Sequence, residues 1–494
     1  MVFIPGTLTA ITDIATHRSP DFDALSSVAA LRFYAPELRG RTVTYHDADW
    51  QGPLGSGQIA LDLKGDGTDA FLKGEVSKTD GSVGSSLRMV VNLYASTREL
   101  ELVQPLVTLV DTHDSYGDPF LKLYGDLVPL DERMFMTETS MLMFYRAMVS
   151  TGGHDEDVRY GNVLSIFDNM YAGYLLHRTA TLTGDIDVME GIIDCDEALA
   201  ITAYWHYVPA SKKSTPVYKD GRWTGRLSNG DIVVDDPKEV RNGSRLGQVM
   251  RAHAGPEEIA LMESLIKLMD AYLINFQNPF AVIYKHMFGK LNWEITTFLG
   301  DTSLVAAFQA LRRSVYVREV SEWQNGNKML VSVAERILSA FRKNRVRADE
   351  AKVMMNATMA GEATQLQIYE EADQKVVVIT NVNNHRISDV LFNYYDVRAV
   401  VVVDGDNLLV RRADGETLRM DSKVILQVLF DAGEINNLDP ASVTEYNLEW
   451  FLHLSGFMIA CGTRKRPAKQ PSSVLPEHLA RAVLELFVAD RLAA

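Results

Sequence analysis

The chain has 494 residues, of which 47% are hydrophobic and 23% charged, the composition of an ordinary globular protein of about two to four domains. Its formal net charge of −16 excludes a broadly basic surface, so contact with nucleic acids or nucleotides requires a locally basic or metal-loaded site. The two cysteines, Cys195 and Cys461, exclude a disulfide framework and a zinc ribbon. The start of the chain lacks the pattern of a signal peptide, and no run reaches the roughly 20 apolar residues of a membrane span. We therefore expect a reduced, cytoplasmic protein that does not enter membranes.

The first 130 residues alternate between strand and helix patterns. Strands are predicted near 8–16, 42–47 and 58–63, and helices near 24–38 and 82–95, from β-branched runs and from apolar residues at helical spacing. This alternation predicts an α/β domain with a parallel sheet over 1–130. Ligands of such sheets lie at the carboxyl ends of the strands.

The remaining chain divides into a helical and a mixed part. Long amphipathic stretches predict a mainly helical region over 131–365, interrupted near 216–234 by a β-hairpin with Asp-Gly and Asn-Gly turn signals. Strand patterns return after 366, and a final helix is predicted from Pro476, so we expect a smaller α/β domain over 366–494. No internal repeat is recognised in the sequence, and the long helical region favours self-association into a homo-oligomer.

The stretch "THRSPDFDALSS", residues 16–27, places His17, Asp21 and Asp23 where a strand passes into a helix. One of the aspartates is expected simply to cap the helix. Imidazole and carboxylate groups are also ligands for Mn²⁺ and similar cations, and an Asp-x-Asp pair can address two ions. Two further carboxylates, Asp62 and Asp111, are expected at the ends of the strands "IALDL" and "LVTLVD". These five residues are the candidate metal ligands.

The stretch resembles the first motif of the DHH phosphoesterase superfamily, His-x-x-Pro-Asp-x-Asp-Ala, in which His17, Pro20, Asp21, Asp23 and Ala24 match. The resemblance implies a phosphoesterase with two divalent metals, Mn²⁺ or Mg²⁺. His17, Asp21 and Asp23 would be ligands, Asp62 would bridge the two ions, and Asp111 would complete the second. Asp23, Asp62 and Asp111 are the implied catalytic residues.

The sequence departs from the superfamily at the third motif. Asp69-Ala70-Phe71 stands where Asp-His-His is expected, so two imidazoles are missing and the second metal site is in question. His113, two residues after Asp111, is a candidate substitute ligand. The competing interpretation is a solvated or hydrogen-bonded loop histidine.

The stretch "FLHLSGFMIACGTRKRP", residues 451–467, resembles the end of the DHH-associated domain, most closely in the melanocyte-proliferating-gene-like exonucleases. The resemblance implies a substrate-binding role here for His453 and Gly462. The basic cluster that follows is suited to phosphate contacts, the alternative being a solvated loop. Its candidate residues are Arg464, Lys465 and Arg466.

Other motifs carry less information. "DCDEALA", residues 194–200, echoes a first-motif signature but lacks the histidine, and we interpret it as an acidic helix start. No Walker loop, Gly-x-Gly-x-x-Gly or Gly-x-Ser-x-Gly occurs. The resemblance thus implies a metal-dependent phosphodiesterase, an exonuclease on short RNA or a hydrolase of small nucleotides. The alternative is a catalytically degenerate nucleotide-binding or assembly protein.

Overall fold

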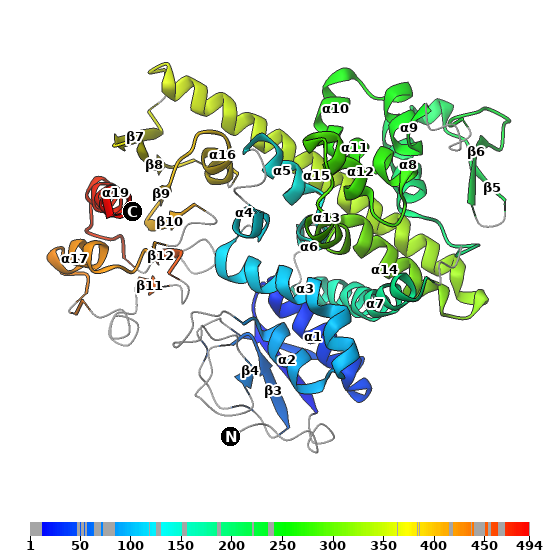
Figure 1. Cartoon of the computed structure of the whole chain (residues 1–494), viewed down its shortest axis with the longest axis horizontal. Coiled ribbons are helices and arrows are strands. Elements are labelled where there is room, and N and C mark those ends of the chain that lie inside the picture. Colours follow the sequence, from blue (N-terminus) through cyan, green and yellow to red (C-terminus); the bar gives the residue numbers. More distant parts are fainter. Residues whose placement is uncertain are drawn as a thin grey trace. The chain divides into compact units, whose positions relative to one another are not determined.

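The computed structural model combines helices with two larger sheets and a small two-stranded one (Figure 1). This agrees with the predicted α/β class. The structure describes residues 12–46, 50, 54, 57–63, 71–72, 84–117, 119–124, 130–150, 156–184, 189–219, 222–235, 242–362, 364–382, 384, 386–413, 418–435, 437–438, 450–452, 456–462 and 470–493.

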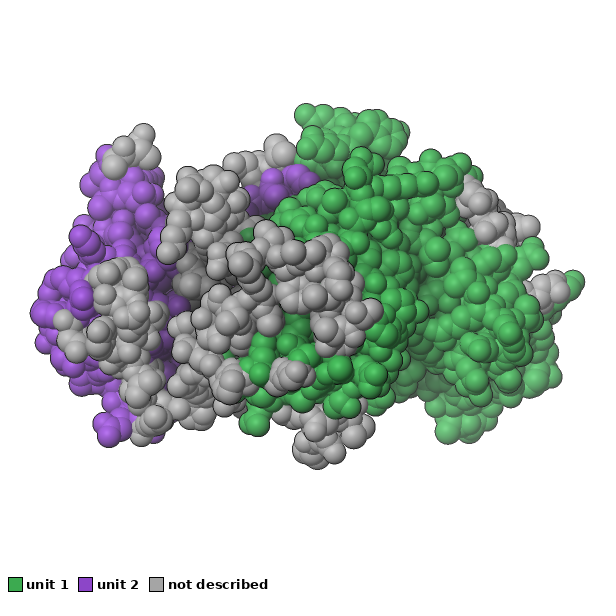
Figure 2. All heavy atoms as spheres, turned by 90° about the horizontal axis from the view of Figure 1, so that it is seen from below, with its two compact units in different colours: residues 1–114, 135–343 green, residues 115–134, 344–494 purple. Residues whose placement is uncertain are grey.

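The chain folds into two compact units, which Figure 2 distinguishes by colour. Unit 1 comprises residues 1–114 and 135–343, and unit 2 comprises 115–134 and 344–494. The three expected domains divide the chain differently. The N-terminal α/β part and most of the helical middle share unit 1, while a segment near 115–134 belongs with the C-terminal part.

Unit 1 contains a sheet of four parallel strands in the order β2-β1-β3-β4. The central strand β1 is buried along most of its length, as expected for a strand paired on both sides. On one face Ala15, Ala60 and Leu63 pack with the half-buried Trp50 and Leu54. The strands are β1 (Asp13–His17), β2 (Val43–His46), β3 (Gln58–Leu61) and β4 (Phe71–Leu72).

Helix α1 (Phe22–Tyr34) begins directly after β1 and packs against β1, α2 and α7. Its first eleven residues are all buried, and all of them except Asp23 and Arg32 have apolar or small side chains. The run "ALSSVAAL" supplies them. A short 3-10 turn, Pro36–Leu38, then leads to β2.

The rest of unit 1 is helical, with the predicted β-hairpin as an excursion. The hairpin pairs β5 (Pro216–Lys219) with β6 (Arg222–Leu227), and the Asn229-Gly230 turn follows with Gly230 at φ +91°. Among the described residues, no helix is both long enough and apolar enough to cross a bilayer. The helices that lie wholly or partly in unit 1 are α1 (Phe22–Tyr34), α2 (Ser86–Tyr94), α3 (Thr97–Tyr116), α5 (Leu130–Glu138), α6 (Met141–Ser150), α7 (Glu156–Thr183), α8 (Cys195–Tyr207), α9 (Arg245–His253), α10 (Pro256–Leu261), α11 (Glu263–Ile274), α12 (Pro279–Phe288), α13 (Trp293–Asp301), α14 (Leu304–Tyr316) and α15 (Trp323–Met359).

Unit 2 is built on a six-stranded sheet in the order β11-β12-β10-β9-β8-β7, in which only β8 and β9 pair in parallel among the described strands. A hairpin with Asp404 and Gly405 at its turn joins β9 to β10. The strands are β7 (Leu366–Glu371), β8 (Gln374–Thr380), β9 (Ala399–Asp404), β10 (Asn407–Arg412), β11 (Trp450–Leu452) and β12 (Met458–Cys461).

Both faces of this sheet are covered, which explains its continuous apolar strands. Val376 and Val378 of β8 pack with α17 (Lys423–Asp431) and α19 (Pro476–Ala493). Val377 and Ile379 face the other side, with α16 (Ile387–Tyr394) and the end of α15. The helix predicted from Pro476 is therefore confirmed. Among the described residues, unit 2 also contains the short helix α4 (Pro119–Tyr124).

Candidate metal centre

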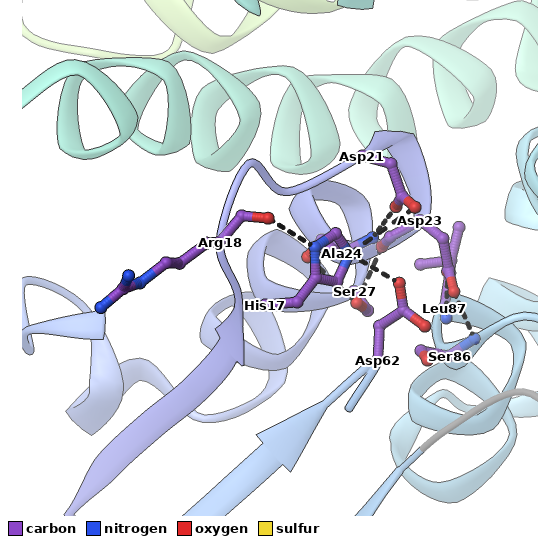
Figure 3. Close-up of polar contacts among 9 residues, drawn as sticks. All are labelled: His17, Arg18, Asp21, Asp23, Ala24, Ser27, Asp62, Ser86 and Leu87. Carbon is purple, nitrogen blue, oxygen red and sulfur yellow. Dashed lines mark hydrogen bonds and ion pairs between the residues drawn. The ribbon is translucent and has the colours of Figure 1, made fainter. Parts of the chain in front are cut away.

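His17 is the last residue of β1, and its ring lies buried between two carboxylates (Figure 3). Its Nε2 is 3.1 Å from Asp62 Oδ2 and 3.6 Å from Asp21 Oδ2. Its Nδ1 lies 3.0 Å from the carbonyl oxygen of Arg18. Because a carbonyl only accepts, Nδ1 carries the proton, and the lone pair of a neutral imidazole is on Nε2, directed at the carboxylates. Such an arrangement could hold a cation between the three side chains.

Asp21 contributes to the cluster from the N-cap of α1. Its Oδ1 accepts a hydrogen bond from Ala24 N–H at 3.0 Å, which satisfies one of the unpaired amides at the helix start. Its Oδ2 faces His17. The sequence-based alternatives, a helix cap or a metal ligand, are therefore compatible, because each role uses a different oxygen.

Asp62 follows β3 directly, at the carboxyl edge of the parallel sheet, as predicted. Its backbone is in the left-handed region at φ +54°, a conformation that aspartate tolerates better than most residues. The Asp62 N–H donates to the carbonyl of Leu72 in β4 at 3.0 Å. This turn brings the carboxylate back toward His17 in place of continuing the strand.

The three side chains form the one group with metal-ligand geometry found among the described residues. One nitrogen and two carboxylate oxygens, from His17, Asp21 and Asp62, all lie within 4.8 Å of one another. This mixed set of imidazole and carboxylate donors fits a divalent cation such as Mn²⁺. Burial lowers the pKa of His17, but the hydrogen bonds and charges of Asp21 and Asp62 outweigh it and hold the pKa well above its usual value. The two carboxylates therefore favour a positive charge at the imidazole.

Asp23, predicted as a ligand, is directed elsewhere. Its buried carboxylate accepts hydrogen bonds from the backbone N–H groups of Ser86 and Leu87, at 2.8 and 2.9 Å, at the start of α2. Burial raises the pKa of Asp23 well above its usual range, and the charges of Asp62 and Asp114 add to the effect. Each oxygen accepts one of these hydrogen bonds, so Asp23 joins α1 to α2, and it is not part of the group that His17, Asp21 and Asp62 form.

Asp111 does not end a strand, and that expectation is wrong. It lies inside α3, where it accepts the N–H of Ser85 at 2.8 Å and pairs with the guanidinium of Arg88. The run "LVTLVD" is rich in β-branched residues, but Leu102, Leu106 and Leu109 form a buried helical face in the same segment. Arg88 was not foreseen as a partner of Asp111, and it supplies a fixed positive charge beside the carboxylate.

The other predicted residues contribute less to this site. His113 packs edge-on against Phe22, and its charge helps to lower the pKa of Asp21, but it is not part of the three-residue group. Asp69 and Ala70 lie outside the described residues, as does the side chain of Phe71.

The C-terminal candidates are mostly outside the described chain. Gly462 is described, in the left-handed region at φ +73°, directly after β12. His453, Arg464, Lys465 and Arg466 lie outside the described residues. Their predicted part in substrate binding stays a prediction.

The segment "DCDEALA" is confirmed as an acidic helix start. Asp194 caps α8 in a capping box with Glu197, in which each side chain accepts the other's backbone N–H. Asp196, the second residue of α8, was not assigned any role from the sequence. Its carboxylate accepts the N–H groups of Arg245 and Leu246 at the start of α9.

Comparison of the chain with models of protein families, with curated protein sequences and with solved structures gives no match. The similarity to the DHH superfamily therefore rests on the motif residues quoted above.

Proposed function

We propose that the chain is a divalent-metal-dependent phosphodiesterase whose cation site is formed by His17, Asp21 and Asp62. The observation that carries this proposal is the direction of His17 Nε2, which faces two carboxylates while Nδ1 is bound to a backbone carbonyl. Histidine ligands of metals characteristically have their second nitrogen fixed in this way. The position at the carboxyl edge of a parallel sheet agrees with where ligands of such sheets bind.

Each side chain has a distinct part in the proposed site. Asp21 and Asp62 provide the negative charge, and the N-cap bond to Ala24 and the turn after β3 fix their orientation. The carbonyl of Arg18 orients the imidazole. A bound divalent cation would supply Lewis-acid stabilisation of the charge that develops during phosphoryl transfer. The substrate class that the motif resemblance supports is short RNA or small nucleotides, held in part by the C-terminal basic cluster.

The test combines cation binding with turnover. Calorimetric titration with Mn²⁺ and hydrolysis of a panel of short RNA, short DNA and linear and cyclic dinucleotides are measured for the wild type and for Asp62→Asn. We expect Asp62→Asn to lose at least tenfold in Mn²⁺ affinity and to abolish turnover, since the amide keeps the size of the side chain but removes its charge. Asp349→Asn, at an exposed position of α15, is the matched control and should change neither.

Two results would count against the proposal. Wild-type hydrolysis that survives both Asp62→Asn and chelation of Mn²⁺ would exclude this site from the reaction. Mn²⁺ binding without turnover on any substrate of the panel would favour the degenerate nucleotide-binding or assembly protein.

A further inference from the structure

Two parts of unit 1, far apart in sequence, are built with the same hydrogen bonds. Helices α1 and α8 are each 13 residues long, and each has an aspartate at the N-cap, Asp21 or Asp194. Each cap accepts the N–H of the third helical residue, Ala24 at 3.0 Å and Glu197 at 2.8 Å. A 3-10 turn follows each helix, at 36–38 and at 210–212.

The second residue of each helix is a buried aspartate that holds a neighbouring helix. Asp23 accepts the N–H groups of Ser86 and Leu87, and Asp196 accepts those of Arg245 and Leu246 at 2.8 and 3.0 Å. Both aspartates are 3% exposed. The helices that they hold, α2 and α9, are each nine residues long and pack against α1 and α8 respectively.

The N-cap residues of α2 and α9 are a third matching pair, because they make the same hydrogen bonds. Ser85 and Ser244 each accept, through Oγ, the N–H of the third helical residue at 3.1 Å. The N–H of each serine donates to an aspartate 26 residues later, Asp111 at 2.8 Å or Asp270 at 2.7 Å.

When Ser85 is aligned with Ser244, the two sequences align without a gap as far as Asp111 and Asp270. The tetrapeptide Gly-Ser-x-Leu occurs at 84–87 and again at 243–246. Further identities between the two segments pair Val90 with Val249, Ala95 with Ala254, Glu99 with Glu258, Leu102 with Leu261, Leu106 with Leu265 and Leu109 with Leu268.

The two halves also meet through a reciprocal contact. Met141 N–H donates to the carbonyl of Thr302 at 2.8 Å, and Leu304 N–H donates to that of Thr139 at 2.7 Å. Ser140 and Ser303 form an antiparallel bridge at this point. Each lies in a Thr-Ser pair that precedes a helix, α6 or α14. A contact in which each side presents the same groups to the other is the mark of two-fold symmetry.

We propose that unit 1 is an internal duplication, and that Asp23 and Asp111 belong to the framework common to both halves rather than to the cation site. The second half makes the same framework bonds with Asp196 and Asp270, and among its described residues no group like His17, Asp21 and Asp62 is found. Glu190, exposed, stands four residues before Asp194, where the first half has His17. Among the residues that the structure describes, His17, Asp21 and Asp62 are then the cation site, and the proposal assigns it one ion in place of the two implied by the motif resemblance.

This inference rests on the proposed function for its account of the cation, but the duplication can be tested without it. Asp23→Asn and Asp196→Asn form a matched pair, because each replaces one oxygen acceptor by an amide donor that faces a backbone N–H. In the presence of a chelator, the melting temperature of both variants should be lower than that of the wild type by roughly 3 °C or more. The two decreases in melting temperature should agree within about a factor of two. Asp111→Asn and Asp270→Asn form a second pair with the same expectation.

Titration with Mn²⁺ tests the assignment of the ligands. We expect one ion per wild-type chain and one ion per chain in Asp23→Asn, whereas Asp62→Asn should bind none with comparable affinity. Two ions in the wild type and one in Asp23→Asn would overturn the inference, as would an Asp23→Asn variant that melts like the wild type while Asp196→Asn is destabilised. If the wild type binds no Mn²⁺, the proposed function fails, and the melting of the two variant pairs still decides whether the duplication holds.

Discussion

Asp62 is both a predicted ligand and a residue with a constrained backbone. Its φ of +54° restricts the position to glycine, asparagine, aspartate and few others, and the proposed site further requires a carboxylate. Holding a non-glycine residue in this region costs on the order of 1 kcal/mol, and such costs are concentrated at functional sites. The agreement of these two constraints at one residue supports a site at the end of β3.

At the same scale, His177 in α7 should make the stability of the protein depend on pH. Burial, with the charges of Arg313 and Arg178, lowers the pKa of His177 to about 4, whereas an unfolded histidine has a pKa of about 6.5. Between these values the unfolded chain binds a proton that the folded chain does not. The free energy of unfolding therefore falls as the pH drops from about 6.5 to about 4, by on the order of 3 kcal/mol from this residue.

Urea unfolding of the wild type and of His177→Gln at pH 7 and pH 4.5 measures this contribution. The glutamine variant cannot gain the proton, so its loss of stability between the two pH values should be smaller than that of the wild type. An equal loss in both proteins would contradict the assignment to His177.

The residues of the site differ in how far the sequence could predict them. His17, Asp21 and Asp62 follow from local pattern, because a strand end and a helix start are short-range features. The position of Asp111 does not, since its apolar neighbours satisfy strand and helix patterns alike and tertiary packing decides between them. The role of Asp23 could not be read from its motif either, because its partners, Ser86 and Leu87, are distant in the sequence.

At the scale of elements, most of the described strands, the β5-β6 hairpin and the final helix follow from periodicity and turn residues, whereas the run "LVTLVD", predicted as a strand, is part of α3. The duplication was not recognised. In the first half the strands of the parallel sheet lie between the matched segments, and in the second half the β5-β6 hairpin lies between them. The matched segments are therefore separated by different numbers of residues in the two halves. What the halves share most clearly is a set of backbone hydrogen bonds, and those become visible only when the chain is folded.

The packing of α7 against α14 gives a prediction for one helix contact. A Cβ added at Gly173 would lie 1.8 Å from the carbonyl oxygen of Ala310, and backbone at that distance cannot move aside cheaply. Gly173→Ala should therefore lower the free energy of unfolding by about 2 to 3 kcal/mol. Gly161 lies in the same helix with nothing within 4 Å of the added atom.

Gly161→Ala is accordingly the matched control, and it should raise the free energy of unfolding by up to about 1 kcal/mol, since alanine is the better helix former. Denaturant unfolding of both variants checks the pair. Equal effects of the two substitutions would show that the close approach of α7 and α14 does not limit the side chain at Gly173.

At the scale of the whole molecule, a cation that binds only the folded chain must stabilise it. A hundredfold excess of Mn²⁺ over its dissociation constant adds about 2.7 kcal/mol to the free energy of unfolding. Thermal unfolding with Mn²⁺ and with a chelator should show this as a higher melting temperature in the wild type. Asp62→Asn should melt at the same temperature in both conditions, and a full Mn²⁺-dependent shift in that variant would place the cation elsewhere.

The reciprocal contact between Thr139–Ser140 and Thr302–Ser303 bears on the origin of the chain. Two separate half-length chains could make this contact with each other unchanged, because every donor on one side meets the same acceptor on the other. Fusion of two such copies would preserve their pairing while freeing each copy to accumulate its own substitutions. One copy would then retain the proposed cation site while the other kept the shared framework, and a dimer of identical subunits cannot have this asymmetry.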